Sequence, residues 1–171
     1  MKRSRSASLP STRAAPIRYW LMKSEPGEFS ISDLEAKGRE PWTGVRNYQA
    51  RNFIRSMHVG DRALFYHSNA KPMGVVGVMD IVSEPYDDPT ANDGPGVPKL
   101  CGGKEKRWSA IDVQFAKTLD RMVTLAELKA AANQRSGEVL RTMALLQRGS
   151  RLSVLPITEA QFTFIVGLSH C

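Results

Sequence analysis

Three strand-like segments follow one another in the middle of the chain, with no helical pattern between them. They span residues 62–68, 73–82 and 108–119. The first two are dense in apolar residues, and the third alternates apolar with polar side chains. Gly74 and Gly77 predict that the second strand is tightly bent or closely packed. Consecutive strands of this kind predict an α+β fold, built on a mainly antiparallel curved sheet or small barrel with short peripheral helices.

Shorter helical and apolar patterns surround these strands. The apolar run at 19–22 predicts a central strand, and residues 152–155 predict a short one stopped by Pro156. Capping residues and helical spacing predict helices at 30–38, 49–57, 124–132, 138–146 and from 158 to near the C-terminus. Residues 39–48 and 84–106 are predicted to be loops, the second of them unusually long for a compact domain.

Basic charge is concentrated at the N-terminus. The chain has 171 residues and a net charge of +7, but residues 1–18 carry five basic side chains and no acidic one. The remainder holds 19 basic residues against 17 acidic ones. We therefore expect residues 1–18 to be a disordered basic tail and residues 19–170 to form a single domain. The tail is compatible with a nuclear address or an organelle transit peptide, so the nucleus, the cytoplasm and an organelle are all considered.

Several functional classes find no support in the sequence. No apolar run approaches the length of a membrane span. Cys101 and Cys171 cannot form a disulfide framework, which favours a reducing intracellular compartment. The histidines, His58, His67 and His170, lack metal-ligand spacing, and there is no phosphate-binding glycine loop or nucleophile elbow. We expect no metal, no cofactor and no membrane association, and a monomer is the simplest expectation.

Aromatic and amide side chains gather near the ends of the expected elements. A planar ligand such as a nucleobase needs flat apolar walls for stacking and a few fixed donors and acceptors for its edge. Trp20 and Phe65 lie in apolar runs and are better explained as core. Trp42, Tyr48 and Trp108 have polar neighbours, and for them core and ligand wall are equally consistent.

Three sets of polar residues each have two possible roles, one structural and one in ligand binding or catalysis. Arg46, Arg51 and Arg55 could contact phosphate or form a solvated face, and Arg51 and Arg55 share one side of a helix. His67 is either a hydrogen-bonded core histidine or an acid/base. Asp112 interrupts the apolar pattern of its strand, as a buried structural partner or as an acceptor in a pocket.

Four motifs occur in order along the chain. They are Trp-Leu-Met-Lys-Ser-Glu-Pro at 20–26, Trp-Thr-Gly-Val-Arg-Asn-Tyr-Gln-Ala-Arg-Asn-Phe at 42–53, Phe-Tyr-His-Ser at 65–68 and Trp-Ser-Ala-Ile-Asp-Val at 108–113. Together they resemble the EVE domain family over residues 19–168. The resemblance implies a PUA-like pseudo-barrel, related to PUA and ASCH domains and to the YTH domain that reads N6-methyladenine.

The resemblance also implies a function and a site. EVE domains are thought to read modified bases, so the implied partner is nucleic acid carrying a modified or flipped-out base, such as a modified cytosine. The implied ligand-binding residues are Ser24, Glu25, Arg46 and Asn47, followed by Trp42, Tyr48, Tyr66, His67 and Trp108. With Asp112 these make up the candidate base site, and Lys23, Arg51 and Arg55 are the candidate phosphate contacts.

Two alternatives to a base reader stay open. An RNA-modifying or nucleotide-processing enzyme, or a subunit of one, would use His67 or Asp112 as an acid/base. A protein or small-molecule interaction module would use the same groove without chemistry. Turnover of the ligand would separate the first alternative from a reader.

Overall fold

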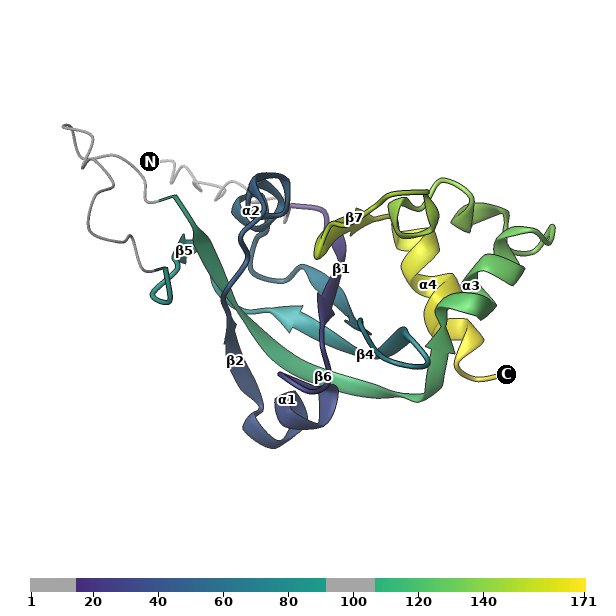
Figure 1. Ribbon diagram of the computed structural model, residues 1–171, viewed down its shortest axis with the longest axis horizontal. Helices are drawn as coiled ribbons and strands as arrows, with labels where there is room; N and C mark the ends of the chain where they lie inside the picture. Colours follow the sequence, from purple (N-terminus) through teal and green to yellow (C-terminus); the bar gives the residue numbers. More distant parts are fainter. Residues whose placement is uncertain (1–14, 92–106) are drawn as a thin grey trace, which may run out of the picture.

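The computed structural model describes residues 15–91 and 107–171, so the expected tail and the second half of the long loop lie mostly outside the described residues. Within these ranges, one curved sheet has the strand order β2-β6-β4-β3-β1-β7, and β5 pairs with β6 (Figure 1). The strands are β1 (Tyr19–Ser24), β2 (Arg39–Trp42), β3 (Arg62–His67), β4 (Gly74–Ile81), β5 (Tyr86–Asp87), β6 (Ser109–Thr124) and β7 (Val154–Ile157). The sheet is open, with β2 and β7 at its two edges.

The pairing is antiparallel except at one place. β1 and β3 run parallel, with Ser24 beside His67, whereas the other paired strands are antiparallel. Strand β6 is long enough to pair with β2, β4 and β5 along its length. The expectation of an α+β fold with a mainly antiparallel curved sheet is therefore confirmed.

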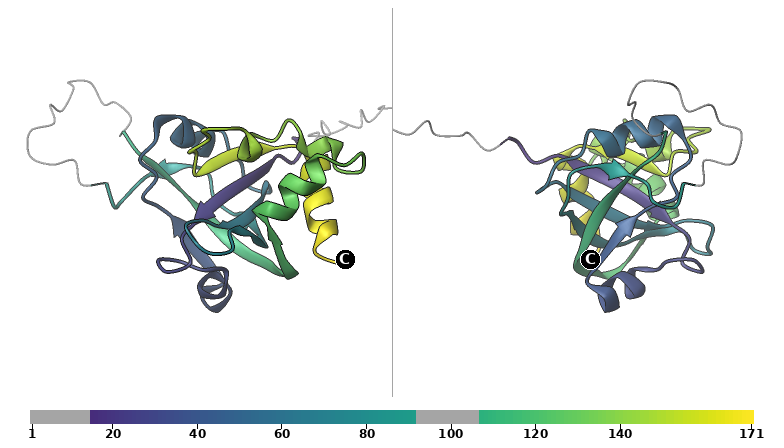
Figure 2. Two further views of the ribbon diagram at one scale, coloured as in Figure 1. Left: turned by 45° about the vertical axis from the view of Figure 1, so that its right-hand side comes forward. Right: turned by 90° about the vertical axis from the view of Figure 1, so that its left-hand side faces the viewer.

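Helices cover both faces of the sheet. They are α1 (Ile31–Lys37), α2 (Tyr48–Arg55), α3 (Leu125–Ala132) and α4 (Glu159–Leu168), with 3-10 turns at Glu138–Leu140 and Ala144–Leu146. Helices α3 and α4 gather at the end of the molecule that holds the C-terminus, while α1 and α2 lie toward the other end (Figures 1 and 2). Capping boxes begin α1, α3 and α4, as the sequence predicts for the last two.

Alternation along the strands divides the core into two clusters. Successive side chains point to opposite faces of a strand, so Trp20 and Met22 join one cluster and Leu21 the other. The first cluster packs beneath α1 and α2, and the second beneath α3 and α4. Trp20 and Phe65 are buried in the first cluster, which confirms their interpretation as core.

Four expectations about local structure are wrong, beginning with the predicted loop at 84–106, in which Tyr86–Asp87 form the short strand β5 against β6. Residues 39–42 form the edge strand β2 rather than part of a loop, because their backbone pairs with β6 although their side chains lack an apolar pattern. Pro156 lies inside β7 instead of ending it, since β7 is an edge strand and can spare one N–H group. Residues 138–146 form two separate 3-10 turns rather than one helix.

Close packing at Gly77 seats α1 on the sheet. A Cβ atom at this position would lie 2.5 Å from Cδ1 of Ile31, the first residue of α1, and 2.9 Å from the carbonyl oxygen of Lys117. The absence of a side chain therefore lets both α1 and β6 approach β4. This agrees with the close packing that the glycines of this strand predict.

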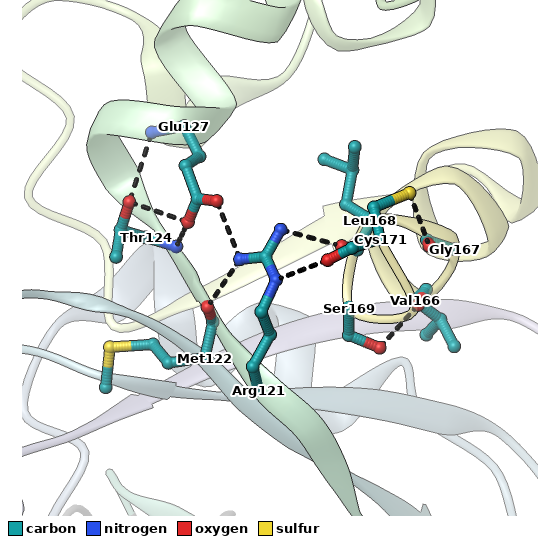
Figure 3. A network of polar contacts seen from close by, with 9 residues as sticks. All are labelled: Arg121, Met122, Thr124, Glu127, Val166, Gly167, Leu168, Ser169 and Cys171. Atoms are coloured by element: carbon teal, nitrogen blue, oxygen red, sulfur yellow. Dashed lines mark hydrogen bonds and ion pairs between the residues drawn. The ribbon is translucent and has the colours of Figure 1, made fainter.

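A single arginine ties the C-terminus to the far end of β6. Arg121 donates to the carbonyl oxygens of Leu168 at 2.9 Å and Cys171 at 3.1 Å, and to Glu127 at 2.6 Å (Figure 3). Glu127 also caps α3 through Thr124. The guanidinium thus gives a further donor to the carbonyl of Leu168, the last residue of α4, and also holds Cys171 beyond the helix, and this network lies away from the site described next.

Candidate functional site

A polar cleft of about 690 Å³ opens where β1 and β2 end. Its walls come from β1 and the turn after it, from β2 and the residues that follow, from the β3–β4 turn, and from the residues before β7. It brings together four of the sequence-predicted site residues, namely Lys23, Ser24, Glu25 and Trp42. The volume lies within the range of small-molecule sites.

Trp42 supplies an aromatic wall of the cleft. Only 8% of this residue is exposed, and its ring packs edge-on against Phe65, with centroids 5.5 Å apart and planes at 80°. Phe65 in turn contacts the rings of Phe29 and His67. The indole is therefore held from behind by the core while it lines the cleft.

The polar edge of the cleft is held in place by backbone hydrogen bonds. The N–H of Lys23 donates to the carbonyl of Ser153 at 2.8 Å, and the N–H of Ser68 donates to the carbonyl of Ser24 at 2.9 Å. The Ser24 hydroxyl donates to the Phe29 carbonyl at 2.6 Å and keeps acceptor capacity on its oxygen. Burial lowers the pKa of Lys23, whose ammonium lies 5.8 Å from the centre of the Tyr66 ring.

His67 supports the cleft from the start of α1. The backbone N–H of Ile31 donates to its Nε2 at 3.2 Å, so this nitrogen is unprotonated. Burial lowers the pKa of the imidazole, which keeps the ring neutral. The histidine thus satisfies one of the N–H groups that the first turn of a helix leaves without a partner.

This contact predicts a pH dependence of stability. The unfolded chain protonates His67 near pH 6.5, whereas the folded protein protonates it only at lower pH. The unfolded state therefore binds more protons just below pH 6.5, and the free energy of unfolding should fall as the pH falls through that interval. Urea unfolding at pH 7.5 and 5.5 should show a smaller difference for His67→Gln than for the wild type. An equal difference in both proteins would contradict a neutral His67.

A buried carboxylate fixes the segment that leaves the cleft. Asp88 accepts hydrogen bonds from the N–H of Gly44 at 2.9 Å, from the Arg46 guanidinium at 2.7 Å, and from the Thr90 N–H and hydroxyl. Burial raises the pKa of this carboxyl, but the hydrogen bonds outweigh that effect and lower it to about 2. Gly44 lines the cleft, so Asp88 connects the cleft to Arg46.

A second group of predicted residues lies outside the cleft, at α2 and the start of β6. The rings of Tyr48 and Trp108 stack there, with centroids 5.0 Å apart and planes at 25°. The guanidinium of Arg46 lies over Trp108 and that of Arg51 over Tyr48. Arg55 donates to the Ser109 hydroxyl at 2.8 Å. The structure therefore divides the predicted residues between a cleft and a surface group.

The remaining predicted residues have structural contacts. Asn47 is the N-cap of α2, and its side chain accepts from the N–H of Ala50 at 3.0 Å. Tyr66 is buried in the second core cluster. Asp112 accepts from Tyr86 at 2.5 Å and Arg39 at 2.6 Å, and these contacts lower its pKa against the effect of burial. Asp112 thus links β6 with β5 and β2.

Sequence reasoning missed several cleft residues. Arg151 and Ser153 reach the cleft from the segment before β7, more than 100 residues after β1. Asp88 lies in the predicted long loop, and only its fold-dependent contacts reveal its importance. In residues 15–91 and 107–171, no three His, Cys, Asp or Glu side chains form a group that could hold a metal ion, and no helix is long and apolar enough to cross a membrane.

Comparison with known proteins identifies the family. The model of the EVE domain matches residues 18–168, which is most of the chain. The chain belongs to the EVE domain family. Thymocyte nuclear protein 1 of Mus musculus is 44% identical over 167 residues, which cover 89% of this chain and 74% of that protein.

Solved EVE domain relatives share the architecture. The human THYN1 protein, solved in complex with DNA containing 5-methylcytosine, is 40% identical with a TM-score of 0.78, covering 90% of this chain and 98% of that one. A protein of Pseudomonas syringae is 44% identical with a TM-score of 0.76, covering 88% and 99%. The curved sheet described above is thus shared by eukaryotic and bacterial relatives.

Proposed function

We propose that this EVE domain is a non-enzymatic reader of 5-methylcytosine in DNA, which it binds as an extruded base in the cleft beside Trp42. The observation that carries the proposal is a cleft of base-binding size with an indole wall and fixed polar groups at its edge. The complex of the human relative with 5-methylcytosine DNA supports the choice of ligand.

The free energies of base extrusion, stacking and methyl burial determine which contacts the cleft must supply. Extruding a base costs a few kcal/mol, which stacking on an aromatic wall can offset, since stacking contributes about 1–3 kcal/mol per base. Burial of one methyl group adds only about 0.8 kcal/mol, roughly fourfold in affinity. Larger selectivity therefore requires shape exclusion and hydrogen bonds from groups such as Ser24.

The contacts of the acid/base candidates favour a reader over an enzyme. His67 is engaged at the start of α1, and Asp112 is joined to Arg39 and Tyr86 rather than to the cleft. Neither side chain lines the cleft. For the compartment, the name of the mouse relative favours the nucleus. We also expect a monomer, which size-exclusion chromatography with light scattering would test.

Filling the cleft tests the proposed function. Ser153→Phe places a ring in the cleft while leaving the backbone bond from Lys23 intact, because that bond uses the Ser153 carbonyl. The wild type should bind a 5-methylcytosine duplex at least about fourfold more tightly than the unmethylated duplex, and Ser153→Phe should lose this preference. Fluorescence anisotropy on matched duplexes measures both affinities.

A matched control places the same ring elsewhere. Ser136 is exposed in the segment after α3 and does not line the cleft, so Ser136→Phe should keep the wild-type preference. Equal affinity of the wild type for both duplexes would refute the proposed function. Retained preference in Ser153→Phe would place the base outside this cleft.

A further inference from the structure

The surface group beside α2 has the composition of a nucleic-acid contact. We call it the arginine–aromatic patch and define it by Arg46, Tyr48, Arg51 and Trp108. Tyr48 is 54% exposed, although aromatic side chains are usually buried to a larger extent. The two guanidinium groups lie 5.6 Å and 4.9 Å from the centres of the Trp108 and Tyr48 rings. The rings therefore hold both cations in defined positions at the surface.

The partners of Arg51 leave its charge available for an anion. Its Nε and Nη2 donate to the side-chain oxygen of Asn52 at 3.1 Å and 2.8 Å, and Nη1 donates to the backbone carbonyl of Arg107 at 2.9 Å. All these acceptors are neutral, unlike the Asp88 carboxylate that holds Arg46. A guanidinium has five N–H donors, and within residues 15–91 and 107–171 three of those of Arg51 have acceptors, which leaves two for a further acceptor.

The charges of the cleft and the patch differ. The cleft lining contains three basic side chains and three acidic ones: Lys23, Lys37, Arg151, Glu25, Glu28 and Glu40. A balanced lining suits a neutral base, whereas a guanidinium with neutral partners suits a phosphate oxygen. Bases give specificity and phosphates give position in protein–DNA complexes, and here the two chemistries occupy neighbouring surfaces.

The chain between the two surfaces is short and fixed. Gly44 lines the cleft and Tyr48 lies four residues later, which is at most about 14 Å along an extended chain. One DNA strand advances about 3.4 Å per nucleotide, so the patch lies within about four nucleotides of a base in the cleft. Asp88 holds Gly44 and Arg46 together and so sets the geometry between the two surfaces.

We propose that the arginine–aromatic patch binds the phosphate backbone of the DNA strand beside the base held in the cleft. Arg51 donates its two remaining N–H groups to a phosphate oxygen, while Tyr48 packs against the guanidinium and fixes its orientation. The inference rests on the proposed function for the base, but the phosphate contact itself is independent of methylation.

Salt dependence tests this contact. The logarithm of the binding constant falls linearly with the logarithm of the salt concentration, and losing one phosphate contact makes this slope shallower by about 0.9. At 0.1 M salt the loss corresponds to about eightfold weaker binding. Arg51→Gln should therefore weaken binding to methylated and unmethylated duplexes by the same factor of about eight, and the ratio of the two affinities should not change. Tyr48→Ala keeps the charge, so it should weaken both affinities by a smaller factor and leave the slope unchanged.

Arg135→Gln is the matched control, because it removes one exposed arginine in the segment after α3. Equal slopes for Arg51→Gln and Arg135→Gln would overturn the phosphate contact. A changed methylation ratio in Arg51→Gln would also overturn it, because Arg51 would then act on the base. Failure of the proposed function is recognised separately, as equal wild-type affinity for the two duplexes, and the slope on the unmethylated duplex still tests the patch.

Discussion

Replacing Asp88 with alanine should destabilise the folded protein by about 3 kcal/mol. The change leaves the Arg46 guanidinium and the N–H of Gly44 without their shared acceptor. Removing one member of a buried ion pair costs about 3–5 kcal/mol, and the lower end applies because the Arg46 side chain is 39% exposed and can reach water. The free energy of unfolding in urea measures the effect.

A half-exposed ion pair provides the control for Asp88. Asp80 pairs with Arg62 at 3.2 Å, with both side chains about 40% exposed, so Asp80→Ala should cost at most about 1 kcal/mol.

The pKa of Asp88 is about 2 in the folded protein and near 3.8 in the unfolded chain. The unfolded state therefore binds more protons between these values, and the stability that Asp88 contributes should be lost as the pH falls from about 4 to 2. Similar losses in the free energy of unfolding for Asp88→Ala and Asp80→Ala would contradict the assigned role of Asp88.

Replacing Trp42 with alanine should abolish selective binding and also weaken the fold. Truncating a buried tryptophan costs about 3–5 kcal/mol, and here it removes both the wall of the cleft and the ring contact with Phe65. Trp42→Phe keeps a flat apolar ring, so it should fold more stably than Trp42→Ala and keep part of the preference for the methylated duplex. Anisotropy and urea unfolding on the same samples separate the two effects.

Trp20 is the matched control for Trp42. It is also buried, with 3% of the residue exposed against 8% for Trp42, but it lies outside the cleft and donates to Asp61 at 3.0 Å. Trp20→Phe should therefore lose stability and keep the wild-type ratio of affinities. If Trp20→Phe lowers the ratio as much as Trp42→Phe does, the ratio reports stability and Trp42 is not a wall of the base site.

The sequence predicts the strands best where neighbouring side chains alone determine burial. Trp20 and Phe65 lie in apolar runs, so their place in the core is evident without the fold. Residues 39–42 have no such pattern, and only pairing with β6 makes them a strand. Asn47 stands just before a helical pattern, where an N-cap is the ordinary expectation, and the structure places it there as the N-cap of α2.

The site is less predictable because distant segments build it. Ser24 and Trp42 come from motifs that the sequence displays, and both line the cleft. Asp88 contacts Gly44 and Arg46, more than 40 positions away, and Arg151 lines the cleft together with residues of β1 and β2, and no local pattern marks either residue. Trp108 and Arg46 are in the motifs as well, but they do not line the cleft and lie instead in the patch, where Asp88 holds the Arg46 guanidinium.

The parallel pairing of β1 with β3 determines where this fold can vary. Because β1 and β3 are parallel, their C-terminal ends lie on the same side of the sheet. The turns that follow the two strands both contribute residues to the cleft. Insertions or substitutions in these two turns would reshape the cavity without changing any strand register. In a scaffold of this kind, changes in two short surface segments can alter which ligand the cleft binds while the buried sheet stays the same.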